Sequence, residues 1–301
     1  MAEAIKPSDP KAVQPAPVAV ETPSGKDAAY ENFPVGSFLL PARLRPHIAD
    51  FYRFARAIDD IADNGNLDPE TKIKRLQGFE AALLGRTADH PAFETAQRMR
   101  RSLEITAITP QHCQDLIAAF KQDATKLRYA DWDDLIGYCI KSAAPVGRYL
   151  VDLHGGSTNG YGPSDALCNA LQVINHLQDC QDDYRTLDRV YLPGDWMQAA
   201  DIDVNDLDRA GATPGLRTVI NQCLDATEDL LRQASALPGG VVSRRLAMES
   251  AAIIEIAWRL CARLRRRDPL AERVALTKGG YIWCCVKGAS LALLGIRQKD
   301  R

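Results

Sequence analysis

The sequence predicts an all-α protein, a single-domain helical bundle with a central cavity. Helical periodicity dominates the chain, strand-like alternation is nearly absent, and 46% of the 301 residues are apolar, which is enough for one large core. Two clusters of aspartates, each at the end of an apolar helical stretch, add a polar site to that core. Helical bundles build such sites from side chains on facing helices.

The predicted helices follow one another with short connections. They cover residues 37–63 with a break near Pro41 and Pro46, then 69–84, 90–107, 110–128, 132–154, 163–186, 212–236, 241–267 and 270–296. Between the sixth and seventh of these, we expect residues 187–193 to form a loop that closes over a site.

The helix ends carry recognisable signals. Asp68-Pro69, Thr109-Pro110 and Pro163-Ser164 provide N-cap or first-turn residues. Gly155-Gly156 and Gly239-Gly240 are typical of helix stops or turns. These signals support the helix order given above.

Two regions make up the predicted domain organisation. Residues 1–27 are rich in Pro, Ala and Val and lack the apolar core segment of a signal peptide, so we expect a disordered leader. Residues 28–301 form one all-helical domain. The formal net charge of -2 provides no overall field for a nucleic-acid partner, and none is expected.

The eight cysteines fall mostly within apolar helical runs and are not spaced as a disulfide framework. This usage predicts a reducing, cytoplasmic location, where cysteine acts as a small apolar side chain. Residues 279–296 are apolar and include Tyr281 and Trp283, which suit a membrane interface. This segment is therefore either a C-terminal core helix or a peripheral contact with the inner face of the membrane.

The first aspartate cluster comprises Asp59, Asp60 and Asp63. It ends a stretch whose apolar residues cover every side of a helix, which indicates burial. Tyr52 and Arg56 lie on the same helical face as these carboxylates. Carboxylates gathered on a buried element repel one another and lose hydration unless a cation is present.

The second cluster contains Asp179, Asp182 and Asp183. The preceding residues 166–178 contain no Asp, Glu, Lys or Arg, so we expect a buried helix whose far end is acidic. Asn175 lies one turn before Asp179 on the same face.

Two interpretations of these clusters remain. Mg²⁺ prefers oxygen ligands and binds through one or two carboxylates together with substrate phosphates, so two facing clusters predict a site for Mg²⁺ and a diphosphate. The alternative is an ion-pair network that braces two helices, with Arg56 and Arg185 as counter-charges. A third pair, Asp225 and Asp229, lies on an ordinary amphipathic helix and is expected to face solvent.

The chain from about residue 30 to 278 resembles the squalene/phytoene synthase family of head-to-head prenyl synthases. The segments that carry the resemblance, in order, are 37–41, 51–63, 138–139, 146–147, 175–183 and 189–193. The resemblance implies an isoprenoid-synthase helical fold in which both acidic motifs hold Mg²⁺ against a substrate diphosphate. It assigns metal binding to Asp59, Asp60, Asp63, Asp179 and Asp183, and all of these except Asp60 to catalysis.

Departures from the family pattern narrow the comparison. Family members that condense two prenyl diphosphates usually carry Arg at the position of Gln178, and a second Tyr at that of Lys141. With segments 31–35, 120–126 and 142–148, the chain resembles the bacterial hydroxysqualene synthase branch. That branch ionises presqualene diphosphate and quenches the cation with water, as a carbon–oxygen lyase in squalene and hopanoid biosynthesis. No reductive step follows, so NADPH is not implied.

The resemblance also implies substrate contacts. Tyr52, Arg56, Asn175, Arg189 and Tyr191 are expected near the diphosphate. Small residues at 143, 144 and 147 would make room between helices for a long apolar chain. Aromatic side chains that line this cavity or pack in the core include Phe38 and Phe54. Candidates for positioning the quenching water are Lys141, Asn175 and Gln178.

Two further functions remain open from the sequence. The chain could condense prenyl diphosphates as a presqualene diphosphate or phytoene synthase, or it could be a catalytically inactive member that acts in assembly as a scaffold. Gln178 and Lys141 count against the first alternative. The retained motif carboxylates count against the second.

Overall fold

The computed structural model describes residues 40–295, and these residues form a helical bundle with almost no strand. The first half contains α1 (Arg45–Ala62), α2 (Pro69–Leu83), α3 (Glu94–Thr106), α4 (Gln111–Asp123), α5 (Trp132–Ser142) and α6 (Ala144–Leu153). The second half contains α7 (Tyr161–Gln178), α8 (Cys180–Leu187), α9 (Gly194–Ala199), α10 (Pro214–Ala234), α11 (Leu237–Gly240), α12 (Arg244–Leu264) and α13 (Lys278–Leu293). Short 3₁₀ helices lie at Pro91–Phe93, Thr158–Gly160 and Val204–Asp208. The predicted all-α class is confirmed.

Side-chain caps begin several helices where the sequence placed a start. Asp68 accepts a hydrogen bond from the Thr71 backbone N–H at 2.9 Å, with Pro69 as the first residue of α2. Thr213 caps α10 in the same way through Leu216 N–H at 3.2 Å. These oxygens satisfy N–H groups that have no partner within the helix.

Two helices that were predicted as continuous are broken. The predicted helix 132–154 divides at Ala143 into α5 and α6, because Pro145 lacks the N–H that would continue the ladder. The predicted helix 163–186 divides at Asp179 into α7 and α8. Aspartate is a poor helix former, because its side chain competes for hydrogen bonds with backbone groups. A backbone hydrogen bond still links α8 to this residue, in which Asp183 N–H donates to Asp179 C=O at 2.8 Å.

The last helix begins eight residues later than predicted. The backbone C=O groups of Val274 and Ala275 accept hydrogen bonds from the side chains of Gln178 and Arg263, so this stretch is held as a loop. The N-cap Thr277 then starts α13. At the other end of the chain, α1 begins beside Pro46, as expected; residues 37–39 lie outside the described part.

Segment 187–193 is not wholly a loop, and this prediction was wrong in part. Residues Val190–Pro193 form strand β2, which pairs in parallel with β1 (Arg128–Tyr129). These are the only strands within residues 40–295. A two-residue strand paired across sixty residues leaves no detectable alternation in the sequence. The pairing fixes the chain that follows the second aspartate cluster against the end of α4.

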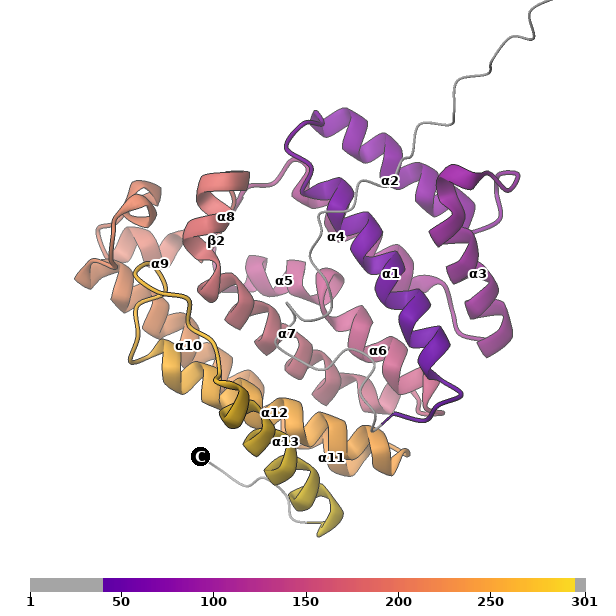
Figure 1. Cartoon of the computed structure of the whole chain (residues 1–301). Coiled ribbons are helices and arrows are strands. Elements are labelled where there is room, and N and C mark those ends of the chain that lie inside the picture. The colour runs from indigo at the N-terminus through magenta and orange to yellow at the C-terminus, as the bar shows by residue number, and fades with distance from the viewer. Residues whose placement is uncertain (1–39, 296–301) are drawn as a thin grey trace, which may run out of the picture.

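The core consists of two hydrophobic clusters. One gathers residues of α1–α4 and α6, including the fully buried Phe54, Phe79 and Tyr149. The other gathers residues of α5, α7, α10 and α12. In Figure 1, α5, α6 and α7 lie between the indigo and purple helices α1–α4 on one side and the orange and yellow helices α10–α13 on the other.

Other sequence predictions have clear outcomes. All eight cysteines are free, and six are buried. Asp225 and Asp229 face solvent, with side chains 69% and 70% exposed, and pair with Arg265 and Arg232. Among the described helices, none combines the length and apolarity that crossing a bilayer requires.

Candidate active site

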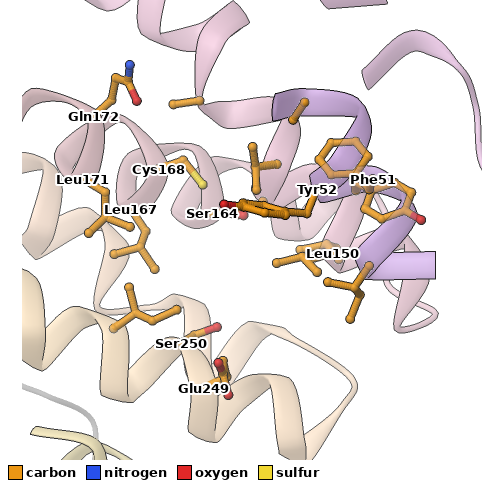
Figure 2. Close-up of a pocket in the computed structure, with 18 of the residues that line it drawn as sticks. Phe51, Tyr52, Leu150, Ser164, Leu167, Cys168, Leu171, Gln172, Glu249 and Ser250 are labelled. Carbon is orange, nitrogen blue, oxygen red and sulfur yellow. The ribbon is translucent and has the colours of Figure 1, made fainter. Parts of the chain in front are cut away.

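A cavity of about 250 Å³ lies between the two hydrophobic clusters. Its walls come from α1, α6, α7 and α12 (Figure 2). Phe51 and Tyr52 of α1 face Leu167 and Leu171 of α7 across it. Most of the lining is apolar.

Close helix packing gives this cavity its shape. A Cβ on Gly147 in α6 would collide with Ser164 Oγ and lie 2.7 Å from Cys168 Sγ in α7. Only glycine lets the two helices approach this closely. Of the three small residues predicted to make room, Ala143 and Gly147 line the cavity.

One end of the cavity is polar. Arg56 and Asp59 from α1 and Asn175 from α7 line it there, as does Tyr52. Arg56 donates to Asp59 at 2.6 Å and to Asp60 at 3.0 Å. The sequence-predicted face of α1 therefore meets the predicted face of α7 at the cavity.

The first aspartate cluster holds more negative charge than its arginine neutralises. Burial raises the pKa of Asp59 well above its usual value, and the carboxylates of Asp63 and Asp60 raise it further, while Arg56 lowers it. The net upward direction means that Asp59 is costly to keep ionised without an added cation.

Arg189 joins the two aspartate clusters. Its backbone N–H donates to Asp183 C=O at 3.2 Å, and its guanidinium donates to the Asp63 carboxylate at 2.6 Å and to Ala62 C=O at 3.0 Å. Arg189 is 5% exposed. The segment after the second cluster is thus attached to the end of the first, which brings the two clusters to one end of the bundle.

The second cluster is more open to water than the sequence suggested. Asp179 and Asp182 are exposed and Asp183 is half-buried, although α7 before them is buried as expected. The reason is the helix break at Asp179, which ends the buried stretch and turns α8 outward. Arg185, one counter-charge of the alternative ion-pair interpretation, pairs with Asp208 at 2.7 Å on the surface.

Sequence reasoning missed Asp123, at the C-terminal end of α4. Asp123 is 3% exposed and accepts a hydrogen bond from the Tyr138 hydroxyl at 2.8 Å. Burial raises the pKa of Asp123 to about 6, against the opposing effect of Arg189. Asp123 lies in segment 120–126, which pointed only to the family resemblance. Its burial depends on Tyr138 and Arg189, which are distant in sequence, so the segment itself did not predict this burial.

An aromatic group supports this region. Tyr191 stacks on His176 with ring centroids 3.6 Å apart. Burial lowers the pKa of His176 to about 3, so the imidazole is neutral at pH 7. Tyr191 is itself buried and does not line the cavity.

Three other predicted substrate contacts have different locations. Gln178 donates its side-chain N–H to Val274 C=O, so it fastens the loop before α13 and does not line the cavity. Phe54 is fully buried in the core, where its ring lies 6.4 Å from that of Phe79. Phe38 lies outside the described residues.

The donor set suits Mg²⁺ although no preformed cage is present. Among residues 40–295, no three Asp, Glu, His or Cys side chains converge closely enough to hold a metal ion by themselves. Mg²⁺ needs only one or two carboxylates when substrate phosphates complete its coordination. The unbalanced negative charge around Asp59 fits such an ion.

Comparison with known proteins identifies the family. The sequence model of squalene/phytoene synthases matches residues 27–279. The chain belongs to the squalene/phytoene synthase family. Within this family it is 46% identical to a hydroxysqualene synthase of Rhodopseudomonas palustris, over 86% of this chain and 87% of that protein. It is 41% identical to a hydroxysqualene synthase of Zymomonas mobilis, over 83% and 84%.

A solved structure of the same family supports the fold. The squalene synthase HpnC from Alicyclobacillus acidocaldarius superposes with a TM-score of 0.68 and 30% sequence identity, covering 77% of this chain and 87% of that one. The predicted family resemblance and the isoprenoid-synthase fold are confirmed.

Proposed function

We propose that the protein is a hydroxysqualene synthase, which converts presqualene diphosphate and water into hydroxysqualene and diphosphate. The observation that carries this proposal is the 46% identity with a hydroxysqualene synthase over most of both chains. An apolar cavity with Asp59, Arg56 and Asn175 at one end matches a substrate with a long hydrocarbon body and an anionic head.

The polar end of the cavity would receive the diphosphate. Mg²⁺ held by Asp59, Asp60, Asp63, Asp179 and Asp183 would neutralise diphosphate charge and make it a better leaving group. Arg56 and Asn175 offer N–H donors beside it. Arg189 keeps Asp63 in place, and Tyr191, which stacks on His176, is part of the buried support of this region and not of the cavity wall.

The apolar part of the cavity would protect the cation. When the C–O bond breaks, the electron pair leaves with the diphosphate, and a carbocation remains on the C30 chain. Walls such as Phe51, Val146 and Leu171 exclude bulk water, which would otherwise quench the cation before it rearranges. A single controlled water then forms the alcohol, and neither an oxidant nor a reductant takes part.

The test uses purified protein, Mg²⁺ and either presqualene diphosphate or farnesyl diphosphate. Hydroxysqualene from presqualene diphosphate alone supports the proposal. Presqualene diphosphate or phytoene made by condensation supports the first alternative from the sequence, and absence of turnover with every prenyl diphosphate supports a scaffold role. We place the reaction in the carbon–oxygen lyases, in squalene and hopanoid supply, without NADPH.

We further propose that α13 contacts the cytoplasmic face of the membrane, from which a water-insoluble substrate would be taken. Three apolar side chains near its start, Ile282, Trp283 and Val286, are 61%, 55% and 57% exposed. Trp283 suits the interface between lipid and water. The α13 helix is anchored to α12, because a Cβ at Gly288 would lie 2.5 Å from the Ala251 and Ala252 backbone.

A further inference from the structure

Glu249 is an ionisable side chain in the apolar part of the cavity. It lies on α12, is 4% exposed, and lines the cavity together with its neighbour Ser250. Figure 2 shows both residues on α12, across the cavity from α1 with Phe51 and Tyr52. A carboxylate is costly in such surroundings, so its presence calls for a chemical reason.

Glu249 lies far from the aspartate clusters. The cavity-lining residues of α7 run from Ser164 to Asn175, and eleven residues of helix span about 16 Å. Asn175 marks the diphosphate end. The 3₁₀ helix before α7 packs against α11, which leads into α12, so the start of α12 with Glu249 lies at the Ser164 end.

Other polar side chains line the cavity at the same end as the Glu249 carboxylate. Ser250 is 4% exposed and Ser164 is 3% exposed, and both line the cavity. An ordered water inside a protein needs two to four polar partners. Burial raises the pKa of Tyr281 in α13, and Cys285 and Glu249 raise it further, so Glu249 also lies near that helix.

A second buried glutamate on the same helix shows what a structural role looks like. Glu255 is 3% exposed and forms an ion pair with Lys287 of α13 at 2.9 Å. It does not line the cavity. Glu255 therefore fastens α13 to α12, whereas Glu249 meets the space that the hydrocarbon would fill.

We propose that Glu249 binds the water that quenches the carbocation and accepts its proton. This inference rests on the proposed hydroxysqualene synthase activity. The water oxygen forms a C–O bond to the cationic carbon as one of its O–H bonds breaks, and that proton passes to a Glu249 carboxylate oxygen. The neutral alcohol leaves, and the glutamic acid returns its proton to solvent. Ser250 orients the water by a hydrogen bond.

The position of Glu249 explains how one enzyme can ionise its substrate at one end and admit water at the other. Diphosphate departs among carboxylates and arginines, while the water is held at a distance by a separate base. Because the negative carboxylate also attracts the cation, it favours attack on the carbon nearest to it. Because Glu249 holds the water on one face of the planar cation, hydroxysqualene should be a single enantiomer.

The decisive experiment follows product identity in Glu249→Gln, which keeps the shape and removes the base. Protein, Mg²⁺ and presqualene diphosphate are combined, and released diphosphate, C30 products and the enantiomer ratio of the alcohol are measured. We expect diphosphate release to persist, the hydroxysqualene share to fall about 100-fold in favour of rearranged hydrocarbons, and the remaining alcohol to lose enantiomeric purity. Glu249→Asp should restore part of the hydroxysqualene share.

Glu255→Gln is the matched control, because it removes an equally buried carboxylate from the same helix. It should keep the wild-type product and enantiomer ratio even if it lowers stability. A wild-type product pattern in Glu249→Gln overturns the role of Glu249. If Glu249→Gln does not fold, an unchanged enantiomer ratio in Glu249→Asp overturns it instead. Failure of the wild-type protein to make hydroxysqualene refutes the proposed function, which is a distinct result.

Discussion

The guanidinium of Arg189 lies 2.6 Å from the carboxylate of Asp63, a residue 126 positions earlier in the chain. Arg189 follows the second aspartate cluster and Asp63 ends the first, so this one ion pair ties the two clusters together. The Arg189 side chain is 6% exposed and that of Asp63 is 31% exposed. Under the proposed function, this contact holds both clusters at the end of the bundle where the diphosphate would bind.

Replacing Arg189 with Met should therefore damage both activity and stability. We expect turnover of presqualene diphosphate to fall about 100-fold, as when a preorganised charged donor is removed. The free energy of unfolding should fall by about 2 kcal/mol, less than for a fully buried pair because Asp63 is partly exposed. The control is Arg185→Met, whose pair with Asp208 lies on the surface and should contribute under about 1 kcal/mol. Equal activity in the two variants would contradict the role of Arg189.

Asp59→Asn should abolish turnover without lowering the thermal midpoint. Burial and the nearby carboxylates of Asp63 and Asp60 raise the pKa of Asp59, so its charge is a cost to the folded state. Removing that charge should leave the protein at least as stable while Mg²⁺ loses a ligand. Asp225→Asn, on the exposed acidic face of α10, should change neither quantity. Kinetics and calorimetry on both variants provide the measurement, and an active Asp59→Asn would refute the site.

Asp123 should make the folded protein less stable as the pH rises from about 4 to about 6. Its folded pKa is raised to about 6, so in this window the unfolded chain has lost the proton and the folded chain has not. The loss should total about 3 kcal/mol. In the Asp123→Asn variant, urea unfolding should show no such fall in the free energy of unfolding across this pH range. Asp68, whose pKa is lowered by Thr71, should give the opposite slope, but only below about pH 4, where the unfolded chain takes up the proton first.

Gly147→Ala should push α6 and α7 apart at the cavity wall. The new Cβ would collide with Ser164 Oγ, and overpacking of this kind costs about 1 to 3 kcal/mol. Turnover should fall as well, since the cavity changes shape. Gly137→Ala is the matched control, because a Cβ there, within α5, meets nothing within 4 Å and should stabilise by about 0.5 kcal/mol. Similar thermal midpoints for the two variants would argue against tight packing at Gly147.

The membrane proposal predicts that the protein co-sediments with anionic phospholipid vesicles and that Trp283 emission shifts to the blue. Replacing Ile282 and Val286 together by Ser should weaken vesicle binding about 100-fold, since each buried aliphatic side chain contributes about 1.5 kcal/mol. Ile105→Ser, which removes a 74% exposed side chain from α3, is the control. If the wild-type protein stays in the supernatant, α13 does not bind lipid.

Much of this fold was accessible from periodicity and local chemistry. The apolar stretches before Asp59 and Asp179 predicted buried helices, and Asp68-Pro69 marked the start of α2 that the structure has. The break at Ala143 was available in principle, because Pro145 cannot continue a helix, but it was not predicted. The pairing of β1 with β2 was not available, since strands of two and four residues are too short to show a period.

The site was predicted in its composition better than in its contacts. The line Tyr52, Arg56, Asp59 follows from helical geometry alone, and the cavity confirms that it faces inward. Asp123 and Glu249 escaped notice because a single carboxylate in a mixed helix reads as a solvated one. Their burial depends on partners from distant segments, which one sequence does not reveal.

The cavity between the two hydrophobic clusters has a further consequence for the stability and the turnover rate of the enzyme. The two clusters make fewer apolar contacts with each other than they would without a cavity between them. A long hydrocarbon bound in the cavity would supply the apolar contacts that are missing. Any occupant that binds the native state alone raises the melting temperature as its concentration grows. Release of the product must break these apolar contacts again. We therefore expect release of the apolar alcohol, rather than breaking of the C–O bond, to limit the turnover rate.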